Sequence, residues 1–317
     1  MHLTLLPLLL GALLLTGCDD AKAPQSTVRL ALQGAYSQNF SADGQDIMVG
    51  SIHHGGSLWS TDPAERLYDW NHKDGTYSTI TTSAFSPDGR FVATTDTRTI
   101  VLWQRDSGEA VWFWNAPGDI KDIALTNNGD LALLGMADYT ATLFDIKNGG
   151  VRLRLPHDGI VYSVSINRDS MVAATGSDDL QVRIWNLSSG QLLHRLPQAN
   201  QVRTVQLSDD GRLLFTSALN DRGRIWDVGT GQLLTEIAHV RGHYSTARFS
   251  ADGRELLTGS SSGLIERWQV NNGTRMNSWR ATADQTLGSR AVLVEDVAFT
   301  QDGYLAAGSN GLLYYLR

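Results

Sequence analysis

Cysteine is almost absent from this chain, because a single residue, Cys18, stands among 317. One thiol cannot form an internal disulfide or a cysteine-based zinc site, which excludes both as stabilising devices. Proline is scarce at 7 residues, and 42% of the chain is hydrophobic, so the composition excludes a proline-rich or disordered chain. The length fits one to three globular domains with a sizeable core.

Positive charge is in deficit, since 26 Lys and Arg stand against 33 Asp and Glu and the formal net charge is −7. Surfaces that bind nucleic acid normally need a basic footprint, so no nucleic-acid partner is expected. Ordinary solubility accounts for an acidic balance of this size, and the balance does not identify a partner.

The longest apolar run lies in the first eighteen residues, MHLTLLPLLLGALLLTGC. It is shorter than the about 20 residues that span a bilayer and has the length of a signal-peptide hydrophobic region. Its ending, Leu15-Thr16-Gly17-Cys18, resembles the lipobox of bacterial lipoproteins, in which the cysteine is lipidated and becomes the mature N-terminus. No Lys or Arg precedes the run, which is unusual for a signal peptide, and an uncleaved anchor or a buried segment is the alternative.

This resemblance implies a signal peptide over residues 1–17 and a lipidated tether over residues 18–26, with Cys18 holding the protein on a membrane. Asp19 and Asp20 follow the cysteine, and aspartate there resembles the inner-membrane retention signal of enterobacterial lipoproteins. We therefore expect a lipid-anchored protein of the cell membrane that faces the periplasm, with the inner membrane favoured.

One turn pattern recurs seven times along the chain. Its copies begin at an apolar residue, namely Phe40, Phe85, Leu125, Ile166, Leu207, Phe249 and Phe299, at intervals of 45, 40, 41, 41, 42 and 50 residues. Periods of about 40–45 residues are typical of four-stranded propeller blades. Six copies contain Asp-Gly or Asn-Gly, which favours the positive φ angles of tight hairpin turns, and the flanking segments alternate with period two.

The sequence therefore predicts an all-β, seven-bladed propeller over residues 27–317, with four antiparallel strands per blade. The seventh repeat ends at Arg317 after its third strand, whereas residues 27–32 have the pattern of a fourth strand without the three that precede it. Pairing these two ends closes the ring and removes exposed sheet edges.

An aromatic residue closes the third strand of six repeats, and in the fourth repeat it is Trp185. With His157, Thr175 and Asp179, this residue resembles the pattern of the WD40-repeat family, in which the four positions form a hydrogen-bonded chain that fastens each blade. The resemblance covers about residues 27–317 and implies a protein-binding scaffold. Only the fourth repeat keeps all four positions, so we expect packing to hold the other blades.

Two intervals are longer than the period. One holds the polar stretch His72 to Ser78, and the other holds about eight extra residues between 281 and 295. Both connect a fourth strand to the next first strand, so both emerge on one face, where insertions often mark a binding surface. His72, Tyr77 and Arg290 are thus candidate partner-binding residues, and a neutral surface insertion is the alternative.

Trp112 and Trp114 lie on the outer strand of the second repeat, where other repeats carry polar or charged residues. Exposed aromatics are enriched at protein interfaces, which makes both residues candidates for partner binding. Packing against a neighbouring blade is the alternative.

The sequence nominates no catalytic residue, metal ligand or cofactor, because it contains no Ca²⁺-loop, P-loop, GxGxxG or HExxH pattern. Gly259-Ser-Ser-Ser-Gly263 formally matches a nucleophile elbow but lies where a strand-to-strand turn is expected. We therefore expect a non-enzymatic, monomeric envelope scaffold that binds protein partners. Two alternatives stay open: a hydrolase or quinone-dependent dehydrogenase with its site at the central channel, and an accessory lipoprotein of outer-membrane assembly.

Overall fold

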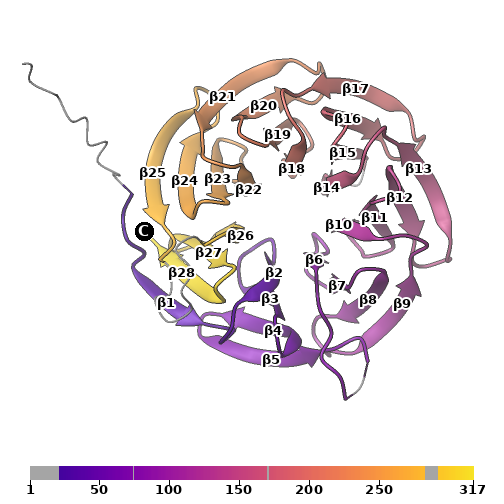
Figure 1. Cartoon of the computed structure of the whole chain (residues 1–317), viewed down its shortest axis with the longest axis vertical. Coiled ribbons are helices and arrows are strands. Elements are labelled where there is room, and N and C mark those ends of the chain that lie inside the picture. The colour runs from indigo at the N-terminus through magenta and orange to yellow at the C-terminus, as the bar shows by residue number, and fades with distance from the viewer. Residues whose placement is uncertain (1–20, 74, 170, 283–291) are drawn as a thin grey trace, which may run out of the picture.

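A computed structural model describes residues 21–282 and 292–317, apart from residues 74 and 170. In this part of the chain, seven four-stranded antiparallel sheets are arranged as blades around a central axis (Figure 1). The predicted seven-bladed propeller is confirmed. The predicted signal peptide and Cys18 lie outside the described residues, and within those residues no helix is long and apolar enough to cross a membrane.

Six blades take their four strands consecutively from the chain, from the innermost strand to the outermost. Blades 1 to 3 are built from β2 (Ala35–Phe40), β3 (Asp46–Ser51), β4 (Gly55–Thr61), β5 (Ala64–Trp70), β6 (Thr82–Phe85), β7 (Phe91–Thr95), β8 (Thr99–Gln104), β9 (Ala110–Asn115), β10 (Ile120–Leu125), β11 (Leu131–Met136), β12 (Thr140–Asp145) and β13 (Val151–Pro156). Blades 4 to 6 are built from β14 (Val161–Ile166), β15 (Val172–Ser177), β16 (Gln181–Asn186), β17 (Leu192–Pro197), β18 (Val202–Leu207), β19 (Leu213–Ala218), β20 (Arg222–Asp227), β21 (Leu233–His239), β22 (Tyr244–Phe249), β23 (Glu255–Ser260), β24 (Leu264–Gln269) and β25 (Thr274–Arg280).

The seventh blade joins the two ends of the described chain. It contains β26 (Val294–Phe299), β27 (Tyr304–Gly308) and β28 (Leu312–Leu316), and its outermost strand is β1 (Ser26–Arg29). The antiparallel register runs from Ser26 opposite Tyr315 to Arg29 opposite Leu312. The predicted closure is confirmed, although β1 ends earlier than expected because the next two amides bond to Gly311 O in a turn.

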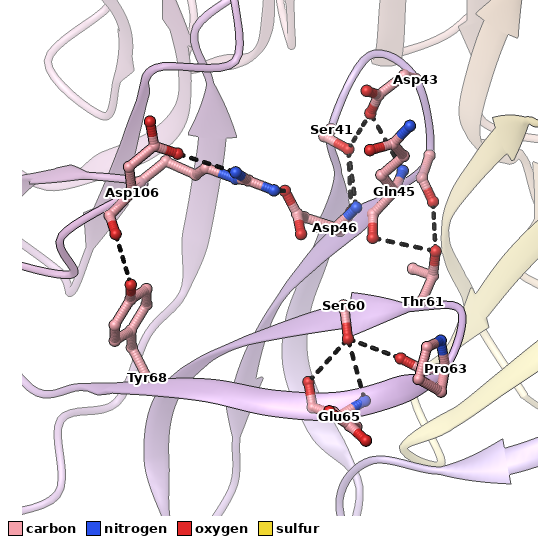
Figure 2. A network of polar contacts seen from close by, with 12 residues as sticks. Ser41, Asp43, Gln45, Asp46, Ser60, Thr61, Pro63, Glu65, Tyr68 and Asp106 are labelled. Carbon is pink, nitrogen blue, oxygen red and sulfur yellow. Dashed lines mark hydrogen bonds and ion pairs between the residues drawn. The ribbon is translucent and has the colours of Figure 1, made fainter.

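The recurrent hairpin turn is held by its own side chains. In blade 1, Ser41 Oγ donates to Asp43 Oδ1 over 2.7 Å and accepts the amide of Asp46 over 3.0 Å (Figure 2). Gly44 has φ +70, a conformation that a side chain would disfavour. Blades 2, 5 and 6 repeat the serine-to-aspartate bond, which explains why this short pattern is the clearest repeat signal.

The apolar core lies between the blades, as one packed cluster for each pair of neighbours. The cluster between blades 2 and 3, for example, joins Ile100 and Leu102 to Ile120 and Leu134. Because side chains alternate across a strand, each middle strand sends apolar residues to both neighbouring interfaces. Each blade is thereby packed on both faces, and the ring has no free sheet face.

The described part of the segment predicted as a tether, from residue 22 onward, is bound to the ring. Lys22 N donates to Ser278 O over 2.8 Å and Arg280 N donates to Lys22 O over 3.0 Å, which forms a parallel bridge at the outer edge of β25. Gln25 N then donates to Tyr315 O. The unpaired backbone groups of an edge strand explain this attachment. Residues 22–26 therefore run along blades 6 and 7 instead of hanging free.

Candidate functional site

Short polar side chains form a closed circuit around the axis, which we call the inner polar ring. Its members stand three positions before the leading apolar residue of each repeat: Ser37, Thr82, Asp122, Ser163, Thr204, Thr246 and Asp296. In six innermost strands, a register shift at the preceding residue turns this position toward the next blade.

Each member of the inner polar ring bonds to the following blade. Ser37 donates to Ile80 O, Thr82 to Asp122, Thr204 to Tyr244 O and Thr246 to Asp296. Asp122, Ser163 and Asp296 accept the amides of Val164, Val205 and Phe40. Sequence reasoning missed this circuit, although the constant offset from the turn was a usable signal.

Two acidic side chains near the axis have raised pKa values. Burial raises the pKa of Asp122 to about 6, against the opposing effect of the Val164 and Ile123 amides that bond to it. Burial also raises the pKa of Glu295 to about 8, and the neighbouring charge of Asp296 adds to the effect. At neutral pH, a pKa of about 8 leaves the Glu295 carboxyl mostly protonated, whereas a pKa of about 6 leaves Asp122 mostly ionised.

Arg248 joins three blades beside the axis. Its Nη2 lies 3.1 Å from Asp296 Oδ2 of blade 7, and its Nη1 donates to Ser41 O of blade 1 over 2.8 Å. The carboxylate of Asp296 therefore contacts blades 1, 6 and 7 at once. A charge-assisted bond of this kind is stronger than a neutral one, so this junction reinforces the seam where the ring closes.

A central hollow of about 1350 Å³ runs along the innermost strands and extends to the face that bears the first turns. Beside it, Arg105 Nε lies 2.7 Å from Asp46 Oδ2, and Tyr68 Oη donates to Asp106 O over 2.7 Å (Figure 2). Burial raises the pKa of Asp46, which Arg105 opposes. Charged residues lining the hollow are Asp43, Asp46, Asp62, Asp106, Asp122, Asp209, Glu295, Asp296, Asp302, Arg105, Arg168, Arg248 and Arg317. Among the charged residues of the lining, carboxyl groups outnumber arginines, so the hollow would favour a cationic ligand over an anionic one.

The four tetrad residues predicted in the fourth repeat are in contact. His157 Nε2 lies 2.7 Å from Thr175 Oγ1, which also accepts the Trp185 Nε1 proton over 2.9 Å. His157 Nδ1 lies 3.0 Å from Asp179 Oδ2. Burial, followed by the charge of Arg183, lowers the pKa of His157 to about 4, so the ring is neutral at physiological pH.

A second tetrad lies in blade 2, where none was predicted. His72 Nε2 lies 2.9 Å from Thr94 Oγ1, Trp103 Nε1 donates to the same oxygen over 2.8 Å, and Asp96 lies 3.6 Å from His72 Nδ1. The His72 side chain is only 6% exposed, so its assignment as a surface residue for partners is wrong. The long interval before this blade hid its equivalence to His157.

Blades 5 and 6 keep only part of the tetrad. Trp226 and Trp268 donate to Thr216 and Thr258 over 2.9 Å. In blade 5, Gln198 stands in place of the histidine, and Thr216 donates to it over 3.4 Å. Tryptophan-to-threonine bonds are therefore more widespread in the ring than the complete tetrad is.

The aromatic side chains of β9 divide between packing and exposure. The Trp112 and Trp114 rings lie 5.4 and 3.9 Å from the Phe144 ring of blade 3, and both are partly buried. Packing against the neighbouring blade thus accounts for these two candidates. Phe113 points the other way and is 70% exposed, because side chains alternate along the strand.

The two long connections each carry a candidate partner-binding residue, Tyr77 in one and Arg290 in the other. Tyr77, between β5 and β6, is 69% exposed, with its ring 5.8 Å from that of His54. Arg290 lies outside the described residues. The β5–β6 connection leaves the ring on the face opposite the first turns, because it joins an outermost strand to the next innermost one. Tyr77 therefore stays an accessible candidate.

Among residues 21–282 and 292–317, with the two gaps noted above, no group of three or more His, Cys, Asp and Glu side chains is placed to hold a metal ion. Gly259 and Gly263 bracket a turn between β23 and β24, as predicted, and not a strand-to-helix turn.

Together these features define a β-propeller with WD-like tetrads in two of its blades and an acidic central hollow. Residues 45–280 match the family model described as "Outer membrane protein assembly factor BamB" (PQQ_2). The match covers most of the chain, so the protein belongs to this family. It is a different family from the WD40 repeats that the tetrad resembles. No curated protein matches the chain.

Proposed function

We propose that this protein is a non-catalytic, membrane-tethered accessory of outer-membrane protein assembly, which binds a protein partner through its propeller. The observation that carries the proposal is the family match over residues 45–280. A rigid ring with short turns supports it, since such a ring offers a preorganised surface at low entropic cost. The WD-like tetrads fit this role as fasteners of the blades.

Two exposed aromatic sites are the best candidates for the partner surface. Tyr77 and Phe113 are 69% and 70% exposed, and buried aromatic anchors often dominate binding energy at protein interfaces. Tyr77 lies on the long β5–β6 connection, which was singled out from the sequence. Phe113 lies on the outer edge of blade 2, so both candidates belong to the same sector of the ring.

The proposed anchor is an acyl group on Cys18, facing the periplasm. The family description favours the outer membrane, whereas Asp19 and Asp20 favour the inner one. Separating the two membranes and locating the protein decides between them. Mass spectrometry of the mature N-terminus tests the anchor itself.

Crosslinking and affinity purification of the intact protein from its own membrane test the proposed function. We expect recovery of a protein of outer-membrane assembly, and we expect Tyr77→Ala or Phe113→Ala to reduce it with the melting temperature unchanged. Trp114→Ala is the matched control, because its ring stacks on Phe144 and its loss should lower the melting temperature. Recovery of a bound quinone or other small molecule without protein would instead favour an enzyme with its site in the central hollow.

A further inference from the structure

The outermost strand of blade 2, β9, turns part of its backbone away from the ring (Figure 1). Just beyond its end, Ala116 N donates to Arg98 O beside β8 over 2.8 Å. In an antiparallel pair, every second residue bonds toward the neighbouring strand, so Asn115 and Phe113 direct their N–H and C=O groups outward. Such groups can bind a further strand.

Blade 6 shows how these groups are used. Beyond the end of β25, Ala281 N donates to Gly263 O over 2.9 Å. By the same alternation, Arg280 and Ser278 are the outward residues of this strand. Lys22 bonds to both, because its N donates to Ser278 O over 2.8 Å and its O accepts the Arg280 amide over 3.0 Å. An extended segment parallel to β25 therefore occupies the outer edge of this blade.

The outward residue in the middle of the strand distinguishes the blades. It stands opposite the residue two positions before the aromatic of the third strand, and in blades 1 to 6 it is Asp69, Phe113, Arg154, Arg195, Glu236 and Ser278. Four of the six are charged, and charge at a sheet edge opposes the addition of another strand. One uncharged position, Ser278, lies where Lys22 binds. The other is Phe113, and no segment of the described residues pairs with its edge.

The edge of β9 also lacks two further protections. Blades 3 and 4 carry Pro156 and Pro197 at the position of Asn115, where proline removes the outward N–H. No charged residue lies within β9, whereas each of the other six outermost strands contains at least one. Phe113 is 70% exposed and Val111 is 47% exposed, so apolar surface adjoins the outward backbone groups.

We infer that the outer edge of β9 binds an extended segment of the partner protein as a fifth strand, parallel to β9, in the way that Lys22 binds to β25. One residue of the segment lies opposite Trp114, donates its N–H to Phe113 O and accepts the Asn115 N–H. The two residues that flank it lie on the face of Phe113, because side chains alternate along a strand. The segment is therefore uncharged, with apolar residues two positions apart.

This inference rests on the proposed function and gives the mode by which the protein partner is recognised, with main-chain bonds for affinity and alternate side chains for specificity. A second copy of this chain fits the edge less well. Two copies of β9 joined by a twofold axis would pair antiparallel, whereas the occupied edge of blade 6 is paired in parallel.

Peptide binding to the full-length mature protein tests the edge directly. The probe is the uncharged peptide acetyl-SVTVTVS-amide, in which valines flank each threonine, and the control probe carries N-methyl groups on both threonines. We expect calorimetry to show binding of the first peptide and at least tenfold weaker binding of the second. The first peptide should also slow hydrogen exchange of the Asn115 amide at least tenfold and leave that of Arg195 on β17 unchanged. No slowing at Asn115 would overturn the inference.

Two variants of one residue separate its N–H from its side chain. Asn115→Pro removes the outward N–H, and Pro156 and Pro197 show that the fold accepts proline at this position. Asn115→Ala is the matched control, because it loses the same side chain and its 3.1 Å bond from Thr99 but keeps the N–H. We expect about tenfold weaker peptide binding in Asn115→Pro alone, with both melting temperatures unchanged. Equal affinities of the two variants would contradict the inference.

Phe113→Arg gives a second variant that leaves the backbone intact. It introduces the residue type that blades 3 and 4 carry at this position, and it should abolish peptide binding without lowering the melting temperature. Undiminished binding would count against an edge that is open because it lacks charge.

Capture of the partner from its own membrane separates this inference from the proposed function. Loss of capture in Asn115→Pro but not in Asn115→Ala would support both. Equal capture by the two variants would leave the proposed function intact and overturn this inference, whereas peptide binding without any captured protein would do the reverse. A dimer of the purified protein that dissociates in Asn115→Pro, measured by sedimentation, would identify a second copy as the occupant and overturn the inference.

Discussion

The innermost and outermost strands of this propeller are built on opposite chemistry. The innermost strands carry one short polar residue each, and these side chains bond from blade to blade in a circuit that ends where it begins. The outermost strands carry arginines and exposed apolar residues, and within the described residues no further strand pairs with their outer edges apart from the Lys22 bridge on β25. The comparison teaches that side-chain hydrogen bonds join one blade to the next in a continuous circuit near the axis, whereas most outer edges leave backbone groups unpaired.

The largest effect is expected from opening the ring at its seam. Deletion of residues 26–31 removes β1 and exposes the edge of β28, and it also removes Leu30 and Ala31 from the core between blades 7 and 1. We expect loss of cooperative unfolding, because the missing strand and core contacts are comparable with the about 5–15 kcal/mol of net stability that domains possess. Thermal unfolding followed by circular dichroism measures this, and a normal cooperative melt would rule out closure by the N-terminal strand.

The next effect compares a complete tetrad with a partial one. Thr175→Val removes the hydroxyl that bonds to His157 and accepts the Trp185 proton in a buried site. We expect the free energy of unfolding to fall by about 2–4 kcal/mol. Thr216→Val in blade 5 is the matched control, because only Trp226 loses a close partner there and the bond to Gln198 is long, at 3.4 Å. Denaturant unfolding of the two variants measures the difference. Equal losses would show that the histidine adds nothing to the blade.

The predictions of the fold were confirmed because they rested on local chemistry. Asp-Gly turns and period-two alternation are dictated by neighbouring residues, so Asp43-Gly44 and its copies could be recognised directly. The site predictions depended on which residues meet across loops of irregular length. His72 was misplaced for that reason, since the long stretch before β6 concealed its pairing with Thr94. The inner polar ring was overlooked because single Ser, Thr and Asp residues carry no distinctive signature until the strands are aligned in space.

A smaller effect concerns pH and the blade 4 histidine. The pKa of His157 is about 4 in the folded protein, below its ordinary 6.5, so the unfolded chain takes up the proton first. The stability that the folded state has with a neutral His157 ring is fully present above pH 6.5 and is lost as the pH falls toward 4. From the pKa shift of His157 we expect the free energy of unfolding to fall by about 3 kcal/mol across that pH window. In His157→Gln the same window should be flatter, which unfolding at a series of pH values checks. An unchanged slope would mean that other groups cause the acid sensitivity.

A second pH effect concerns the acid at the axis, whose pKa shift is at least as large as that of His157. The pKa of Glu295 is raised to about 8, above its ordinary 4.5, so its ionisation opposes folding as pH rises from 4.5 toward 8. Glu295→Gln should therefore raise the melting temperature clearly at pH 8, by about 5–10 degrees, and change it little at pH 5. A lower melting temperature at pH 8 would indicate that the carboxylate is stabilised by a favourable contact.

Hydrogen exchange of individual backbone amides tests the contrast between axis and rim most directly. The amides of Phe40, Val164 and Val205, in blades 1, 4 and 5, donate to members of the inner polar ring in the preceding blades. All three should exchange only through global unfolding and with the same free energy. Amides on the outer side of β9 should exchange faster by orders of magnitude. If the three inner amides instead exchange with different free energies, blade by blade, the ring does not unite the propeller and the contrast is wrong.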